Sequence, residues 1–209
     1  MRITLTQLAH DIADALAAVD ATRPVHKSFQ PGIGPFGESE AVRAALTWLK
    51  ANRTEKYSKA VIKRLPDLLV PGEWAVEFKI IRPFGDNGKA AEHWSENVLH
   101  PYAGNTSSLG DCTKLADCNL SEQKAVVIIG YEHTPPLVEL EAAIASFELI
   151  GREVTMVQLS QRVEELRSGL VHPVHQQFRV HGYEVLGLRS GSIAAGSVPA
   201  SRSGVGTDH

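Results

Sequence analysis

The sequence has few cysteines and no long apolar run. Its 209 residues include only Cys112 and Cys118 as cysteines, which is too few for a disulfide scaffold, so we expect reduced thiols. No suitably spaced set of further ligands accompanies them, which argues against a zinc site. No stretch approaches the roughly 20 apolar residues of a membrane span. The apolar N-terminal residues are interrupted by His10, Asp11 and Asp14, so no signal peptide is expected. These absences predict a soluble, cytoplasmic protein without a membrane partner.

The sequence also lacks extreme charge and low-complexity segments. Its net charge is −3 and 43% of its residues are hydrophobic, enough to bury a substantial core. We expect one α/β domain over residues 1–189, with its core at about 30–160. Residues 190–209 are rich in Gly, Ser, Ala and Val without a pattern, which predicts a flexible C-terminal tail.

The small negative net charge argues mildly against a general nucleic-acid binder, because such proteins gain much of their affinity by neutralising phosphates. The distribution of charge weakens that objection. Between residues 50 and 64 there is one acidic residue, Glu55, against six basic ones: Lys50, Arg53, Lys56, Lys59, Lys63 and Arg64. Such a run could hold a nucleic-acid backbone, although a solvated helix and loop would look similar.

Residues 65–79 carry the most informative pattern in the chain. Pro71 and Gly72 form a turn signal between two apolar runs, which predicts a hairpin. From Trp74 to Ile81 the sequence alternates with the period of a strand. The alternation places Trp74, Val76, Phe78 and Ile80 on a core-facing side and Glu77 and Lys79, with Ala75 and Ile81, on the other.

Asp67, Glu77 and Lys79 would converge at this hairpin. The two carboxylates and the backbone carbonyl of Phe78 would offer oxygen ligands to a hard cation such as Mg²⁺. The metal would stabilise charge on phosphorus and acidify a water, which Lys79 would orient or help to deprotonate. The alternative is an exposed cross-strand ion pair between Glu77 and Lys79. The apolar flanks favour a buried site instead, where unpaired charges are costly.

The segment Pro66-Asp67, followed by nine residues and then Glu77-Phe78-Lys79, resembles the motif of the PD-(D/E)XK nuclease superfamily, also called restriction endonuclease-like. The resemblance covers roughly residues 30–160. It implies a restriction endonuclease-like sandwich, in which a central mixed β-sheet is flanked by helices, and a Mg²⁺-dependent phosphodiesterase that cuts DNA. We expect Mn²⁺ to substitute for Mg²⁺.

Members of that superfamily commonly carry another acidic residue on the helix before the hairpin. A loop rich in glycine and proline ends at Gly37, and residues 38–49 are expected to be helical. Glu38 lies one turn before the apolar stripe, so we assign it as the auxiliary acid, with Glu40 as the weaker choice. Alternatively, both carboxylates simply favour the positive end of the helix dipole.

Further apolar patterns complete the expected α/β fold. Residues 124–131 form a continuous apolar run, typical of a central strand covered on both faces, and we place it beside the Glu77 strand. Helices are expected at 90–99, through Asp111 to Leu115, and from Pro135 to about Gly151. A further strand is expected at 154–159. This alternation predicts an α/β sandwich around a mixed sheet.

Several polar residues around the hairpin are candidates for contacts with nucleic acid. They share a basic or amide side chain near the expected cleft: Lys56, Lys59, Lys63, Arg64, Arg82, Asn105 and Lys114. Ordinary capping and turn chemistry also explains Asn105. His172 and His175 are interpreted as loop or strand residues, because Pro173 argues against a regular helix there.

The leading hypothesis is an endonuclease of the restriction or DNA-repair type, acting on double-stranded DNA. One alternative is a nucleic-acid-binding module that cleaves poorly. Another is an interaction subunit of a defence or repair complex. No separate target-recognition domain is evident, so a partner or a homodimer would have to help select the substrate.

Overall fold

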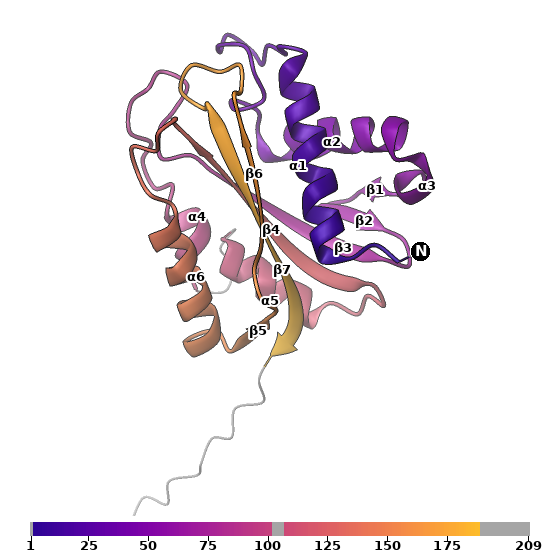
Figure 1. The fold of residues 1–209 in the computed structure, drawn as a ribbon. Helices are drawn as coiled ribbons and strands as arrows, with labels where there is room; N and C mark the ends of the chain where they lie inside the picture. The colour runs from indigo at the N-terminus through magenta and orange to yellow at the C-terminus, as the bar shows by residue number, and fades with distance from the viewer. Residues whose placement is uncertain (1, 102–106, 189–209) are drawn as a thin grey trace, which may run out of the picture.

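The computed structural model describes residues 2–101 and 107–188 (Figure 1). Within them, groups of helices and groups of strands follow one another along the chain, and the α/β prediction is confirmed. The elements are α1 (Leu5–Ala21), α2 (Glu38–Asn52), α3 (Thr54–Tyr57), β1 (Val61–Ile62), β2 (Leu68–Val70), β3 (Trp74–Ile81), α4 (Glu96–Leu99), α5 (Ser108–Asp117), β4 (Gln123–Glu132), α6 (Glu141–Glu153), β5 (Val157–Leu159), β6 (Val163–Ser168) and β7 (Gln177–Leu188).

The described strands form one mixed seven-stranded sheet. Its order is β1-β2-β3-β4-β7-β5, and β6 also pairs with β7. β3 and β4 run parallel, with Glu77 opposite Val126, whereas the other pairs are antiparallel. The chain between β3 and β4 carries α4 and α5, as a parallel crossover requires. The predicted position of β4, buried and beside the Glu77 strand, is confirmed.

Helices cover both faces of the sheet (Figure 1). α1 and α2 pack on one face, where the first core contains Trp74, Val76, Phe78 and Ile80 of β3. α5 and α6 pack on the other face, where the second core contains Ile81 together with Val126 and Ile128. The predicted alternation of β3 is therefore confirmed, and Glu77 and Lys79 point toward the α5 side.

The predicted hairpin joins β2 to β3, with Leu68 opposite Val76. Gly72 adopts φ 76° in the turn, a conformation that costs glycine little because it has no Cβ. β2 is only three residues long, and Asp67 precedes it rather than lying within it. β3 continues to Ile81, so its second half has no neighbouring strand on the β2 side.

Three element boundaries differ from the sequence prediction. The helix expected at 90–99 is limited to α4, because His93 adopts a positive φ of 59° that interrupts a helix. The helix expected from Pro135 begins only at Glu141. The strand expected at 154–159 is shortened to β5, since Val154 caps α6 and Met156 has φ 57°.

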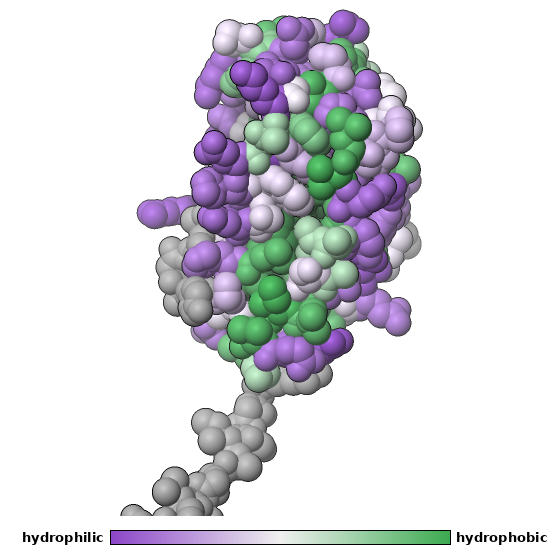
Figure 2. Space-filling model, turned by 90° about the vertical axis from the view of Figure 1, so that its left-hand side faces the viewer, coloured by the Kyte–Doolittle hydropathy of each residue, from purple (hydrophilic) through white to green (hydrophobic). Residues whose placement is uncertain are grey.

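Two expectations concern the ends of the chain and its surroundings. The predicted tail, residues 190–209, lies outside the described residues. Across residues 2–101 and 107–188, no helix has the length and apolar character needed to cross a membrane. Figure 2, which views the side at the left of Figure 1, shows a band of hydrophobic side chains flanked by hydrophilic ones.

Candidate active site

The bare edge of β3 is covered by two carboxylates. The Phe78 backbone N–H donates to Asp67 Oδ2 at 2.9 Å, and the Ile80 N–H donates to Glu38 Oε2 at 3.1 Å. These N–H groups would bind a neighbouring strand if β2 were longer, and a buried N–H without an acceptor is costly. The early end of β2 therefore creates the place where Asp67 and Glu38 meet β3.

Lys79 lies between two acidic residues from opposite layers of the fold. Its Nζ is 3.4 Å from Glu38 Oε1, at the start of α2, and 3.2 Å from Asp111 Oδ2, on α5. Burial lowers the pKa of Lys79, but Glu38 and Asp111 outweigh burial, so the net shift is upward. Lys79 is therefore a buried ammonium group at neutral pH. The pKa of Glu38 is raised, chiefly by burial, although Lys79 opposes that shift.

Glu77 is buried next to Asp67, and its charge is poorly compensated. Its Oε1 has no hydrogen-bond partner among the described residues. Burial raises the pKa of Glu77 to about 9, and Asp67 adds to the shift through repulsion and a hydrogen bond with the protonated carboxyl. Asp111 contributes further repulsion. The Glu77 carboxyl would therefore ionise readily only if a cation were added beside it.

Asp111 belongs to this site, although the sequence analysis did not assign it a role. Its Oδ1 accepts a 2.8 Å hydrogen bond from Lys114, and its other oxygen faces Lys79. Asp111 is buried on the apolar side of α5, among Leu109, Cys112 and Leu115. A carboxylate within the apolar stripe of an amphipathic helix is the sequence signal that could have identified it.

The proposed metal ligands are two side chains and one backbone carbonyl. Within the described part of the chain, no three His, Cys, Asp or Glu side chains are grouped so that they could hold a metal ion. Glu38 and Asp111 are engaged with Lys79, which leaves Asp67 and Glu77 as a pair. In a strand, the N–H and C=O of one residue point to the same side, so the carbonyl of Phe78 lies on the same edge as Asp67. Two carboxyls and this carbonyl fit the oxygen donor set of a hard cation.

The remaining predicted nucleic-acid contacts are scattered. Lys114 lies in the site, beside Asp111. Lys56 is instead bonded to the buried Asp11 of α1 at 3.2 Å. Three further members of the basic run, Lys59, Lys63 and Arg64, are exposed on the segment leading into the hairpin. Asn105 lies outside the described residues.

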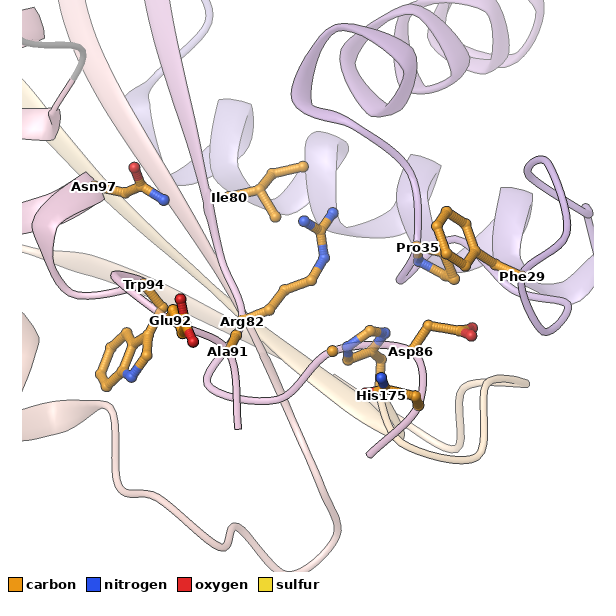
Figure 3. Close-up of a pocket in the computed structure, with 12 residues that line it drawn as sticks. Phe29, Pro35, Ile80, Arg82, Asp86, Ala91, Glu92, Trp94, Asn97 and His175 are labelled. Atoms are coloured by element: carbon orange, nitrogen blue, oxygen red, sulfur yellow. The ribbon is translucent and has the colours of Figure 1, made fainter. Parts of the chain in front are cut away.

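Arg82, just beyond the end of β3, points into the protein rather than toward solvent. Its Nε donates to the Gly34 carbonyl at 2.6 Å, a second nitrogen donates to the Phe36 carbonyl, and the guanidinium lies over the Tyr131 ring. Burial lowers the pKa of Arg82. Ile80 and Arg82 together line a cavity of about 430 Å³ at the end of β3 (Figure 3).

His175 lines this cavity, and His172 packs against His175. Their rings stack with centroids 4.4 Å apart, and His172 Nε2 is 2.8 Å from Asp86 Oδ1. His175 Nε2 is 2.9 Å from the Phe84 carbonyl, and burial lowers the pKa of His175 to about 4. The pair thus joins two loops through ring stacking and hydrogen bonds, in agreement with its assignment to a loop.

Comparisons of the chain with protein families, with curated proteins and with solved structures give no match. The functional assignment therefore rests on the geometry and chemistry of the residues themselves.

Proposed function

We propose that the protein is a metal-dependent endonuclease with a restriction endonuclease-like arrangement, which hydrolyses phosphodiester bonds of double-stranded DNA. The observation that carries this proposal is the excess of buried and partly buried carboxyl groups around one strand edge. Four carboxyl groups (Glu38, Asp67, Glu77 and Asp111) gather around two ammonium groups (Lys79 and Lys114). Such a site lacks positive charge, which a divalent cation would supply.

Asp67, Glu77 and the carbonyl of Phe78 would hold the cation. In the described chain Glu77 Oε1 has no partner, and burial and neighbouring carboxylates raise the pKa of Glu77 to about 9. Both features support this fit, because they reflect a lack of positive charge, which a cation would supply as it displaces the proton. When bound, Mg²⁺ or Mn²⁺ would stabilise charge on the phosphate and lower the pKa of an attacking water.

Lys79 would act as a fixed hydrogen-bond donor. Its raised pKa favours an ammonium group that orients water or a phosphate oxygen over a general base. Glu38 would be a positioning residue, since it contacts both the Lys79 ammonium and the Ile80 N–H. The side chain of Lys79 is thereby fixed in place before substrate arrives.

A purely structural explanation exists for the same contacts. Asp67 and Glu38 accept backbone N–H groups, and this alone would justify their presence. Glu77 is not explained in this way, because its buried Oε1 has no partner in the described chain. Substitution of Asp67 by asparagine separates the two roles, since the amide oxygen still accepts a hydrogen bond but carries no charge.

The test is cleavage of supercoiled plasmid, single-stranded DNA and branched DNA with Mg²⁺ or Mn²⁺. We expect the parent to cut, Asp67→Asn and Lys79→Met to lose at least about a hundredfold in rate, and all variants to stay folded. Asp117→Asn, at an exposed position of α5, is the matched control and should cut normally. Equal activity of Asp67→Asn and the parent would refute the metal role of Asp67.

The weaker alternative is a DNA-binding module. It would be supported if the parent bound DNA in a metal-dependent manner and cut none of these substrates. A gel-filtration measurement on the same samples would show whether the protein forms the homodimer that we expect to assist substrate selection.

A further inference from the structure

The cavity beside β3 adjoins the candidate site through Ile80, whose N–H binds Glu38. Arg82, just beyond the end of β3, also lines the cavity. In Figure 3, Trp94 and Asn97 lie on one side of the cavity and Phe29 and Pro35 on the other, with Arg82 between them. A base bound in the cavity would belong to a DNA strand whose backbone passes the Asp67 and Glu77 carboxyls.

The size and lining of the cavity suit a flat aromatic group with polar edges. Its volume of about 430 Å³ falls in the range of roughly 300–1,000 Å³ of small-molecule sites. Trp94 and Phe29 offer aromatic surface, and Asn97 and Glu92 offer hydrogen-bonding groups. Aromatic stacking combined with a few polar contacts is the way proteins hold a base that has left the duplex.

Arg82 and two acidic lining residues set the charge of the cavity. The Arg82 guanidinium is bonded inside the protein to two backbone carbonyls and lies over the Tyr131 ring. The lining also includes the carboxylates of Asp86 and Glu92, of which Asp86 contacts His172. The cavity therefore does not favour an anionic group, and it suits the neutral, polar edge of a base rather than its phosphate.

We propose that this cavity holds an unpaired base of the DNA substrate, with Trp94 as a stacking surface and Asn97 and Glu92 as hydrogen-bonding groups for its polar edge. This inference rests on the proposed function and narrows it. The protein would act on duplexes in which a base can leave the stack, at a bulge, mismatch or branch, which favours a repair-type role over restriction of regular duplex.

The test compares two duplexes that differ only at a single-nucleotide bulge, which carries either a normal base or an abasic sugar. Affinity is measured by fluorescence anisotropy with Mg²⁺ in the Lys79→Met background, so that the DNA stays uncut. We expect the base to improve binding by about tenfold. Trp94→Ala should remove this preference, whereas Trp94→Phe should retain most of it because the aromatic surface remains.

Trp48→Ala is the matched control, since Trp48 lies on α2 next to Arg53 and does not line this cavity. Equal affinity for both duplexes in the parent, or the same loss in Trp48→Ala as in Trp94→Ala, would overturn the proposal. The two proposals fail separately. Metal-dependent cleavage without a base preference removes only the cavity assignment, whereas a base preference without cleavage by the parent removes only the nuclease assignment.

Discussion

Two buried acidic clusters lie on different sides of the same sheet, and they differ in how completely they are paired. In the first, Asp11 on α1 is fully buried and receives hydrogen bonds from Gln7, Tyr57 and Lys56 at 2.9 to 3.2 Å. Arg53 adds an ion pair at 3.5 Å. Both oxygens of Asp11 therefore have partners within the protein.

The second cluster, around Lys79, is incomplete. Glu77 Oε1 has no hydrogen-bond partner in the described chain, and Asp111 Oδ2 has only the ion-pair distance to Lys79. Buried polar atoms without partners reduce stability. The first cluster is explained by folding alone, whereas the second makes physical sense if a cation or substrate completes it.

The largest difference should appear in stability. Asp11→Ala leaves the buried Tyr57 hydroxyl and the Lys56 ammonium without an acceptor, so we expect a loss of about 2–3 kcal/mol of unfolding free energy. This is below the usual cost of breaking a buried pair, because Lys56 and Arg53 are partly exposed. Glu77→Gln should cost little or even stabilise the metal-free protein. Urea denaturation at pH 8 without divalent cations measures both.

Asp11→Asn serves as a control that keeps the shape of the side chain and one acceptor oxygen. We expect an intermediate loss for it. If Glu77→Gln proved as destabilising as Asp11→Ala, the two clusters would have the same structural role and the contrast between them would disappear.

The second prediction concerns metal and pH. The folded pKa of Glu77, about 9, lies above its unfolded value of about 4.3, so the stability due to this group is present below pH 4 and falls as pH rises toward 9. Mg²⁺ should replace the proton and restore stability. At about ten times its dissociation constant it would add about 1.4 kcal/mol, with a larger thermal shift at pH 8 than at pH 6.

Differential scanning fluorimetry with and without Mg²⁺, at both pH values, gives this result directly. Asp67→Asn and Glu77→Gln should lose most of the shift, while Asp11→Asn keeps it. A shift of equal size at both pH values would show that the metal does not compete with the Glu77 proton.

Much of the arrangement around β3 was predictable because it depends on local patterns. The alternation from Trp74 to Ile81 determines which side chains face each core, and Pro71-Gly72 determines the turn. These two features need only strand periodicity and turn signals. Glu38 was chosen because the resemblance implies an acidic residue on that helix and Glu38 precedes its apolar stripe, and the structure brings it to Lys79.

Asp111 and the cavity were not predicted, because they arise from contacts between distant segments. Asp111 reaches Lys79 only because α5 packs across β3, which neither element's own pattern indicates. The direction of Arg82 likewise depends on the carbonyls of the loop before α2. The interruption at His93 depends on a single residue with positive φ, which propensities at neighbouring positions do not reveal.

The third prediction tests Asp111 as a positioning residue for Lys79. Asp111→Asn keeps the size of the side chain but removes the charge that raises the pKa of Lys79. We expect a loss of about tenfold in kcat/KM, with little change in DNA affinity. On the alkaline side of the pH profile, the activity of the variant should fall at a lower pH than that of the parent. The reason is that the Lys79 ammonium is less stabilised and loses its proton earlier as pH rises. An unchanged profile would restrict Asp111 to packing.

The smallest expected effect is on DNA binding, when one lysine from each cluster is replaced. Lys114 is 42% exposed and bonded to Asp111, so it can turn to a phosphate, whereas Lys56 is committed to the buried Asp11. Lys114→Ala should weaken DNA binding only a few-fold and reduce the salt dependence by the equivalent of about one phosphate contact. Lys56→Ala should leave the salt dependence unchanged. If instead Lys56→Ala lowered it and Lys114→Ala did not, the DNA would pass over the basic run before the hairpin rather than over α5. The role of Lys114 would then be limited to its ion pair with Asp111.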